Sequence, residues 1–113
     1  MQNQLDYYTY LKKQAKERDQ ALPKLAAAQD VMREEAYKDG LLSRKVKRLI
    51  ALGIALGAGC TGCILGQTKQ SLNAGATKNE IFEVIGVAMS MRGTTGGSEA
   101  LEVIKFLDEM DTE

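Results

Sequence analysis

The sequence predicts an all-α protein, a single-domain antiparallel bundle of about six helices. Three observations support this prediction. Apolar residues recur at intervals of three and four, no alternating β-branched run occurs, and Pro23 is the only proline. A chain of 113 residues is long enough to enclose one hydrophobic core. We therefore expect one domain over residues 1–113, with N-terminal helices in residues 1–39 and the core unit in residues 40–113.

Two helices are predicted before residue 40. A polar helix runs from about Leu5 to Asp19, and a second begins near Pro23 and is stopped by Gly40. Proline is favoured in the first turn of a helix, and glycine is favoured just after the last turn. We expect a short loop between the two helices.

The third and fourth helices are predicted to be the central ones. Ser43 can cap the third helix, whose apolar residues cover most of its circumference. These residues are Val46, Leu49, Ile50, Ile54 and Leu56. The fourth helix begins around Cys60 and ends at Gly75. No residue between 49 and 68 is charged, but Gly59 and Gly62 would break one continuous helix, so two buried helices are predicted rather than a membrane span.

The fifth helix has the clearest start. Thr77 and Glu80 form a capping box, in which each side chain accepts a hydrogen bond from a backbone amide. The glycine-rich stretch 93–97 ends this helix, and a last helix carries Leu101, Ile104 and Leu107 on one face. Residues 93–98 lack the lysine and spacing of a phosphate-binding loop, so we interpret them as a flexible connector.

The charge balance limits the class of partner. Fifteen basic and fifteen acidic residues cancel, so no global field attracts nucleic acid or an anionic membrane. We expect a small-molecule or protein partner instead. The N-terminal segment MQNQLDYYTYLKK has no secretory signal, which predicts a cytoplasmic protein. In that reducing compartment, two cysteines separated by two residues are more often catalytic or metal-binding than structural.

Cys60 and Cys63 are predicted to form a redox-active dithiol. Residues three apart share a helix face and lie close enough for a disulfide. If Cys60 lies in the first helical turn, the unpaired amides and the helix dipole lower its thiol pKa from about 8.5 toward neutrality. Cys60 is then the attacking sulfur. Cys63, one turn deeper and more shielded, is the resolving thiol.

Two other interpretations of the cysteine pair remain open. Free cysteine is among the most buried residue types, so both thiols can be small apolar fillers of a packed helix pair. Structural zinc needs four ligands, and a chain without histidine offers only two thiolates, so a zinc site requires a symmetric dimer. We expect no metal and no other cofactor.

Several linked motifs carry a resemblance to a known family. They are the apolar helix before the cysteines, the Cys-x-x-Cys itself, the turn at residues 74–77 with Glu80, and the glycine-rich turn after the next helix. The stretch from Gly40 to Met91 thereby resembles the carboxymuconolactone decarboxylase and alkylhydroperoxidase D-like family. The resemblance implies an all-helical fold and homo-oligomers such as trimers or hexamers, with active sites near subunit contacts. Residues 40–113 would be the family core.

The cysteine pair favours one branch of that family. The resemblance implies that the alkylhydroperoxidase D branch uses the pair for thiol-dependent peroxide reduction, whereas the decarboxylase branch generally lacks it. In the redox branch a glutamate lies twelve residues before the first cysteine and a histidine four after the second, and these two form a proton relay. Here those positions hold Arg48 and Gln67. The usual relay is therefore missing.

Neither replacement can act as a general acid or base at neutral pH. Gln67 lies one turn beyond Cys63 on the same helix face, so it can hydrogen-bond near the sulfur. Arg48 would stabilise a thiolate and attract an anionic substrate if it reaches the site. The alternative is a solvated charge in the basic cluster of residues 44–48. The candidate site residues are Cys60, Cys63, Gln67 and Arg48.

Three functional hypotheses follow. The first is a thiol-dependent oxidoreductase that acts on a peroxide or a disulfide and is recycled by a small thiol or a thiol reductant protein. The second is a non-redox decarboxylase-like enzyme that binds a small organic acid near Arg48. The third is a non-catalytic oligomeric relative. Three tyrosines of the first helix are expected at a subunit contact, the alternative being anchors in the core: Tyr7, Tyr8 and Tyr10.

Overall fold

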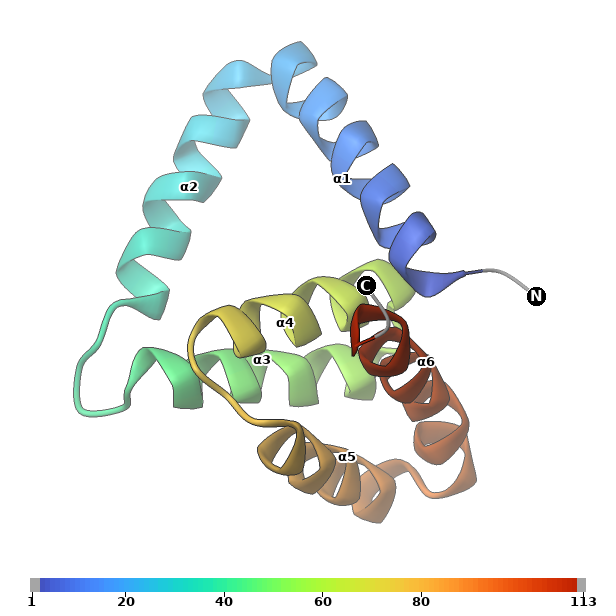
Figure 1. Cartoon of the computed structure of the whole chain (residues 1–113). Helices are drawn as coiled ribbons and strands as arrows, with labels where there is room; N and C mark the ends of the chain where they lie inside the picture. Colours follow the sequence, from blue (N-terminus) through green and yellow to red (C-terminus); the bar gives the residue numbers. More distant parts are fainter. Residues whose placement is uncertain (1–2, 112–113) are drawn as a thin grey trace.

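A computed structural model describes residues 3–111, which form six α-helices and no strand. The helices are α1 (Gln4–Ala21), α2 (Pro23–Tyr37), α3 (Arg44–Ala58), α4 (Thr61–Asn73), α5 (Lys78–Arg92) and α6 (Thr94–Asp111) (Figure 1). The predicted all-α class and the number of helices are confirmed. No helix in this range has the length and apolar character needed to cross a membrane.

The predicted starts of three helices are confirmed. Pro23 stands at the first turn of α2, directly after the one-residue junction with α1. The Ser43 hydroxyl accepts a hydrogen bond from the backbone amide of Val46 at 3.1 Å. Thr77 and Glu80 make both bonds of the capping box, at 2.9 and 3.1 Å. The caps of α3 and α5 satisfy amides that would otherwise have no partner in the helix.

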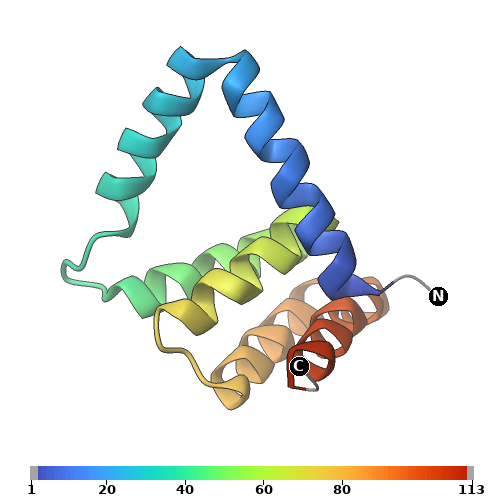
Figure 2. The same cartoon turned by 45° about the horizontal axis from the view of Figure 1, so that its top comes forward.

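The core lies among α3, α4, α5 and α6. Figures 1 and 2 show α3 and α4 side by side, with α5 and α6 packed against them. Fully buried apolar side chains from all four helices meet in the centre: Leu52, Leu56, Ile64, Ile81 and Val103. Burial of this apolar surface is the main stabilising contribution to the fold.

The first two helices form an arm outside this core, which we call the α1–α2 arm. Neither helix contains a buried residue. Figures 1 and 2 show α1 crossing α6 and α4 before α2 runs back to α3, so that the arm outlines an open triangle. The arm therefore covers one side of α4 and can line a cleft there.

The arm is attached through its N-terminal half. The Tyr8 and Phe106 rings pack with their centroids 5.3 Å apart. The Glu109 carboxylate accepts hydrogen bonds from the backbone amides of Gln4 and Leu5 at 3.0 and 2.6 Å. Tyr8 is thus an anchor within the chain, the alternative to the expected subunit contact. Tyr10 is 55% exposed.

The glycine-rich stretch after α5 is not the flexible connector that the sequence predicts. Gly93 alone is the turn, and α6 already begins at Thr94. Gly96 is buried where α6 crosses α5, and a Cβ there would lie 3.1 Å from the Ala88 carbonyl oxygen. This glycine is therefore needed for the close approach of two helices, a requirement that a local pattern of small residues does not reveal.

Candidate dithiol site

The turn between α3 and α4 positions the two cysteines. Gly59 ends α3 with a φ of 72°, in the left-handed region that favours glycine. A Cβ at this position would also lie 3.0 Å from the Glu99 carboxylate. Glycine makes this turn without backbone strain, and the next residue, Cys60, becomes the N-cap of α4. The predicted start of α4 around Cys60 is confirmed, and the helix ends at Asn73 rather than Gly75.

The cap bond links the two cysteines. The Cys60 sulfur accepts a hydrogen bond from the backbone amide of Cys63 at 3.3 Å. The sulfur takes the place of the hydroxyl or carboxylate oxygen that usually caps a helix. Cys60 therefore holds its sulfur at the positive end of the α4 dipole, the location in a helix that best accommodates a negative charge.

The environment of Cys63 disfavours its thiolate. The hydrogen bond between the two thiols raises the pKa of Cys63, and desolvation by neighbouring atoms raises it further. Its thiol remains neutral at a pH where an ordinary thiol begins to ionise. The two sulfurs thus differ in electrostatic environment although they lie one helical turn apart.

Both cysteines are free and exposed in the chain. Cys63 is exposed like Cys60, although neighbouring atoms desolvate its thiol. The alternative in which both thiols fill a packed helix pair is contradicted, since neither belongs to the core. Within residues 3–111 no three histidine, cysteine or acidic side chains form a group suited to a metal ion.

Arg48 and Gln67 are brought together by α3 and α4. An Arg48 guanidinium nitrogen donates a hydrogen bond to Gln67 Oε1 at 3.2 Å. The same guanidinium lies over the Tyr37 ring, 3.5 Å from its centroid, and desolvation lowers the pKa of Arg48. Arg48 is half-buried, so its interpretation as a solvated charge is wrong. Arg48 therefore keeps its positive charge and holds the Gln67 side chain by a hydrogen bond.

A cleft of about 570 Å³ opens beside the cysteines, between the α1–α2 arm and α4. Four of the residues that line it come from α1, namely Leu11, Gln14, Ala15 and Arg18. Arg33 comes from α2, and the remaining five come from α4 and its cap: Cys60, Gly62, Cys63, Gly66 and Gln67. We call this the dithiol cleft. The structure therefore places three of the four predicted site residues on one surface, and Arg48 behind Gln67.

Two arginines of the dithiol cleft were not predicted from the sequence. Arg18 and Arg33 belong to the N-terminal helices, which carry no motif. No sequence pattern links these arginines to the distant cysteines, and only the fold of the arm brings them close to α4. The cleft is thus shared between the motif-bearing core and the arm.

A carboxyl group at the start of α4 was missed as well. The Thr61 hydroxyl donates a 3.4 Å hydrogen bond to Glu102 Oε1, so this α6 side chain lies next to the residue that follows Cys60. Desolvation raises the pKa of Glu102, and the nearby Glu99 carboxylate adds to the increase. No local pattern distinguishes Glu102 from the other acidic residues of α6.

Comparison with known proteins adds a family context. The sequence model described as the carboxymuconolactone decarboxylase family matches residues 23–106. An uncharacterised protein of Cupriavidus necator is 33% identical over 92 residues, which are 81% of this chain and 81% of that protein. Uncharacterised protein 4 in the cox locus of Paracoccus denitrificans is 37% identical over 75 residues, 66% of this chain and 68% of that protein.

Solved structures share the fold over nearly the whole chain. The apo crystal structure of a carboxymuconolactone decarboxylase family protein from Legionella pneumophila aligns with a TM-score of 0.84 and 28% identity, over 92% of this chain and 96% of that one. A family protein from Thermotoga maritima, for which a role in an antioxidative response is suggested, aligns with a TM-score of 0.73 over 94% of this chain and 91% of that one. At 21% identity this second likeness shows the fold alone.

Proposed function

Because this chain belongs to the carboxymuconolactone decarboxylase family, we propose that it is a thiol-dependent oxidoreductase with Cys60 as the attacking sulfur and Cys63 as the resolving thiol. The observation that carries the proposal is the bond from the Cys63 amide to the Cys60 sulfur at the exposed start of α4. This bond and the helix dipole place the Cys60 sulfur at the positively polarised end of α4, which supports its role as the nucleophile. The raised pKa of Cys63 supports its role as the proton-bearing partner.

The reaction with a disulfide takes two steps. The Cys60 thiolate attacks one sulfur of the substrate, forms a mixed disulfide and releases the first substrate thiolate. Cys63 then loses its proton and attacks the Cys60 sulfur, which closes the internal disulfide and releases the second thiolate. The substrate is reduced to two thiols and the dithiol is oxidised. A small thiol or a thiol reductant protein of the cytoplasm would return the pair to the reduced state.

A hydroperoxide would react through a sulfenic acid on Cys60. The O–O bond breaks, an alcohol leaves, and Cys63 condenses with the sulfenic acid to give the disulfide and water. The departing alkoxide needs a proton, whereas a departing thiolate does not. Arg48 and Gln67 cannot supply that proton, and they are already bonded to each other. We therefore propose that disulfides are better substrates than peroxides.

The direct test is the fate of the two thiols. We expect one equivalent of a small disulfide to convert the reduced chain into a species lighter by two hydrogens, with both cysteines lost to alkylation. Intact-mass spectrometry and a non-reducing gel measure this. A chain that keeps both thiols, or that joins to other chains through disulfides, would contradict the proposal. Activity toward an organic acid that survives alkylation of both cysteines would favour the non-redox alternative instead.

An apolar groove supports a further part of the proposal, assembly into a homo-oligomer such as a trimer or hexamer. The groove lies between α3 and α5 and has a volume of about 480 Å³. Its lining includes Ile54 and Val87, which are 68% and 66% exposed in the single chain. An apolar surface of this kind favours burial against another protein surface. We propose that a second copy covers it.

Replacing Ile54 by glutamate should dissociate the oligomer, because a buried unpaired charge opposes association. Size-exclusion chromatography with light scattering measures the mass. Leu101→Glu is the matched control, since Leu101 is 62% exposed on α6, outside the groove. A wild-type monomer, or equal dissociation by both variants, would contradict the assignment of this groove.

A further inference from the structure

The charges of the dithiol cleft all have one sign. Among the residues that line it, Arg18 and Arg33 are charged and none is acidic. The two arginines come from different helices of the arm, and the cysteines come from α4. An anionic group on a molecule that reaches the thiols would therefore meet a guanidinium from α1 or from α2.

Gln67 adds a further donor to this surface. A guanidinium can only donate hydrogen bonds, so its bond from Arg48 fixes the Gln67 oxygen as the acceptor. The Gln67 amide nitrogen then keeps its two N–H groups for other partners, and Gln67 lines the cleft. Arg48 thus contributes to the cleft by orienting an amide rather than by contacting a ligand.

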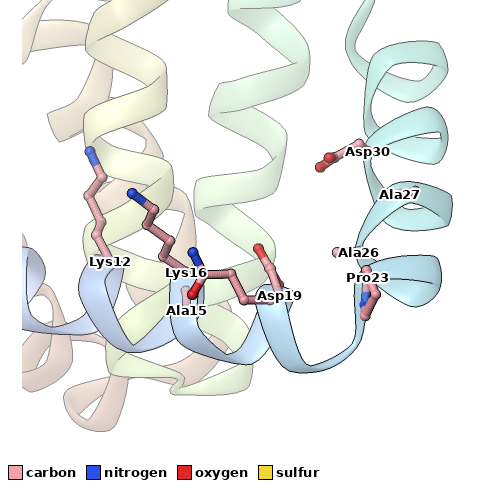
Figure 3. A pocket seen from close by; sticks show the side chains of 9 residues that line it. Lys12, Ala15, Lys16, Asp19, Pro23, Ala26, Ala27 and Asp30 are labelled. Atoms are coloured by element: carbon pink, nitrogen blue, oxygen red, sulfur yellow. The ribbon is translucent and has the colours of Figure 1, made fainter.

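A second pocket, on a neighbouring face of the arm, shows that this charge pattern is local. Its volume is about 620 Å³, and Figure 3 shows Lys12, Lys16 and Asp19 projecting from α1 while Asp30 projects from α2. These four charges balance. Of these two pockets, only the one that faces the cysteines therefore has an excess of positive charge in its lining.

Arg18 and Arg33 each form an ion pair with an aspartate, but these pairs leave both guanidinium groups accessible to a ligand. Arg18 pairs with Asp19 at 3.1 Å and Arg33 with Asp30 at 3.7 Å, and the arginine side chains are 56% and 52% exposed. Both aspartates line the balanced pocket of Figure 3 and not the dithiol cleft. Exposed pairs of this kind are weak and exchange readily with another anion.

We propose that Arg18 and Arg33 select small disulfides that carry carboxylate groups. The inference rests on the proposed reaction of Cys60 and adds its substrate class. A carboxylate bound by one or both guanidinium groups places a nearby S–S bond over the start of α4, and the volume of the cleft suits a small molecule of this kind. Arg18 and Arg33 are then specificity-determining residues contributed by the arm.

The test uses reagents that differ in charge and share their chemistry. The rate of internal disulfide formation would be measured with dithiodipropionate, which is anionic, hydroxyethyl disulfide, which is neutral, and cystamine, which is cationic. We expect the double variant Arg18→Ala, Arg33→Ala to react about tenfold more slowly with the anionic reagent at low salt, to react unchanged with the neutral one, and to react faster with the cationic one. In the wild type, added salt should lower the rate of the reaction with the anionic reagent and should not lower the rates with the other two.

A matched control separates the cleft from the overall charge. The double variant Lys13→Ala, Lys16→Ala removes the same net charge from exposed positions of α1 outside the dithiol cleft and should leave all three rates near those of the wild type. If this control loses the anionic preference to the same extent, or if the arginine variant slows every reagent equally, the inference is wrong. The proposed function survives either outcome, because the dithiol still reacts.

A second measurement does not depend on redox chemistry. Iodoacetate and iodoacetamide alkylate thiols in the same way and differ only in the carboxylate. The wild type should show a ratio of iodoacetate to iodoacetamide rates at Cys60 that falls in the arginine variant and not in the lysine control. If no disulfide oxidises the protein while this ratio behaves as expected, the proposed function fails and the anion selectivity stands. An unchanged ratio overturns the selectivity.

Discussion

Replacing Cys60 by serine is expected to reduce disulfide turnover by roughly a thousandfold or more. The hydroxyl of serine ionises far less readily than a thiol, so the attacking nucleophile is lost. Cys63 does not replace it, because it lies inside α4 and not at the N-cap position that the helix dipole favours for a negative charge. Steady-state turnover with a dithiol reductant measures the loss. Ala58→Ser, an exposed change two residues earlier, is the control and should retain activity.

The companion variant should stop the reaction halfway. With Cys63→Ser, Cys60 still attacks the substrate, but the mixed disulfide accumulates because no second thiol resolves it. Intact mass should show the chain plus half of the disulfide reagent. Equal turnover by wild type and both cysteine variants would exclude a dithiol mechanism altogether.

The resolving step should also depend on pH in a defined direction. Only the thiolate of Cys63 attacks. In the mixed disulfide Cys60 is no longer a thiol or a thiolate, so its contributions to the raised pKa of Cys63 are lost and only desolvation still raises that pKa. Release of the second substrate thiol should therefore accelerate as the pH rises. Stopped-flow measurement of the two released thiols separates the two steps.

Replacing Phe106 by alanine is expected to have the largest effect on stability. Phe106 is fully buried and packs against Tyr8, so the change leaves a cavity beneath α1. The free energy of unfolding should fall by about 3–5 kcal/mol, and the melting temperature by roughly 10–20 °C. Chemical denaturation and thermal unfolding measure these changes.

The loss should extend to the dithiol cleft. The Tyr8–Phe106 contact helps to attach α1 to α6, and α1 carries Arg18. Amide hydrogen exchange should therefore increase in α1 more than in α5. The other phenylalanine provides the control. Phe82 is 44% exposed on α5, so Phe82→Ala should cost well under half as much stability. Equal destabilisation by both variants would show that Phe106 does not anchor the arm.

Local patterns were sufficient where the determining contacts lie within a few residues. The capping box at Thr77 and Glu80, the Ser43 cap and the start of α2 at Pro23 all depend on neighbours in the sequence. The same holds for the cysteine pair, since the cap bond joins residues three apart. These features could be predicted because the backbone itself brings such groups together.

Contacts between distant helices were not predictable in this way. Gly96 belongs to a glycine-rich run that suggests a connector, yet its small size is required by the carbonyl of Ala88 on another helix. Tyr8 lies on a polar helix, and its ring still finds Phe106 almost a hundred residues later in the chain. In both cases the partner that decides the role is absent from the local sequence.

The same distinction between local and long-range contacts applies to the candidate site. The sequence by itself determined the all-helical class, the cysteine pair at the start of α4, and the presence of Arg48 and Gln67 where the family resemblance implies a glutamate and a histidine. Only the tertiary structure decided that Arg48 is bonded to Gln67, that both thiols are exposed, and that Arg18 and Arg33 face them. The physical reason is how far apart in the sequence the interacting residues lie. Helix formation and capping depend on near neighbours, whereas the charge around the sulfurs depends on where packing places an arm that no motif marks.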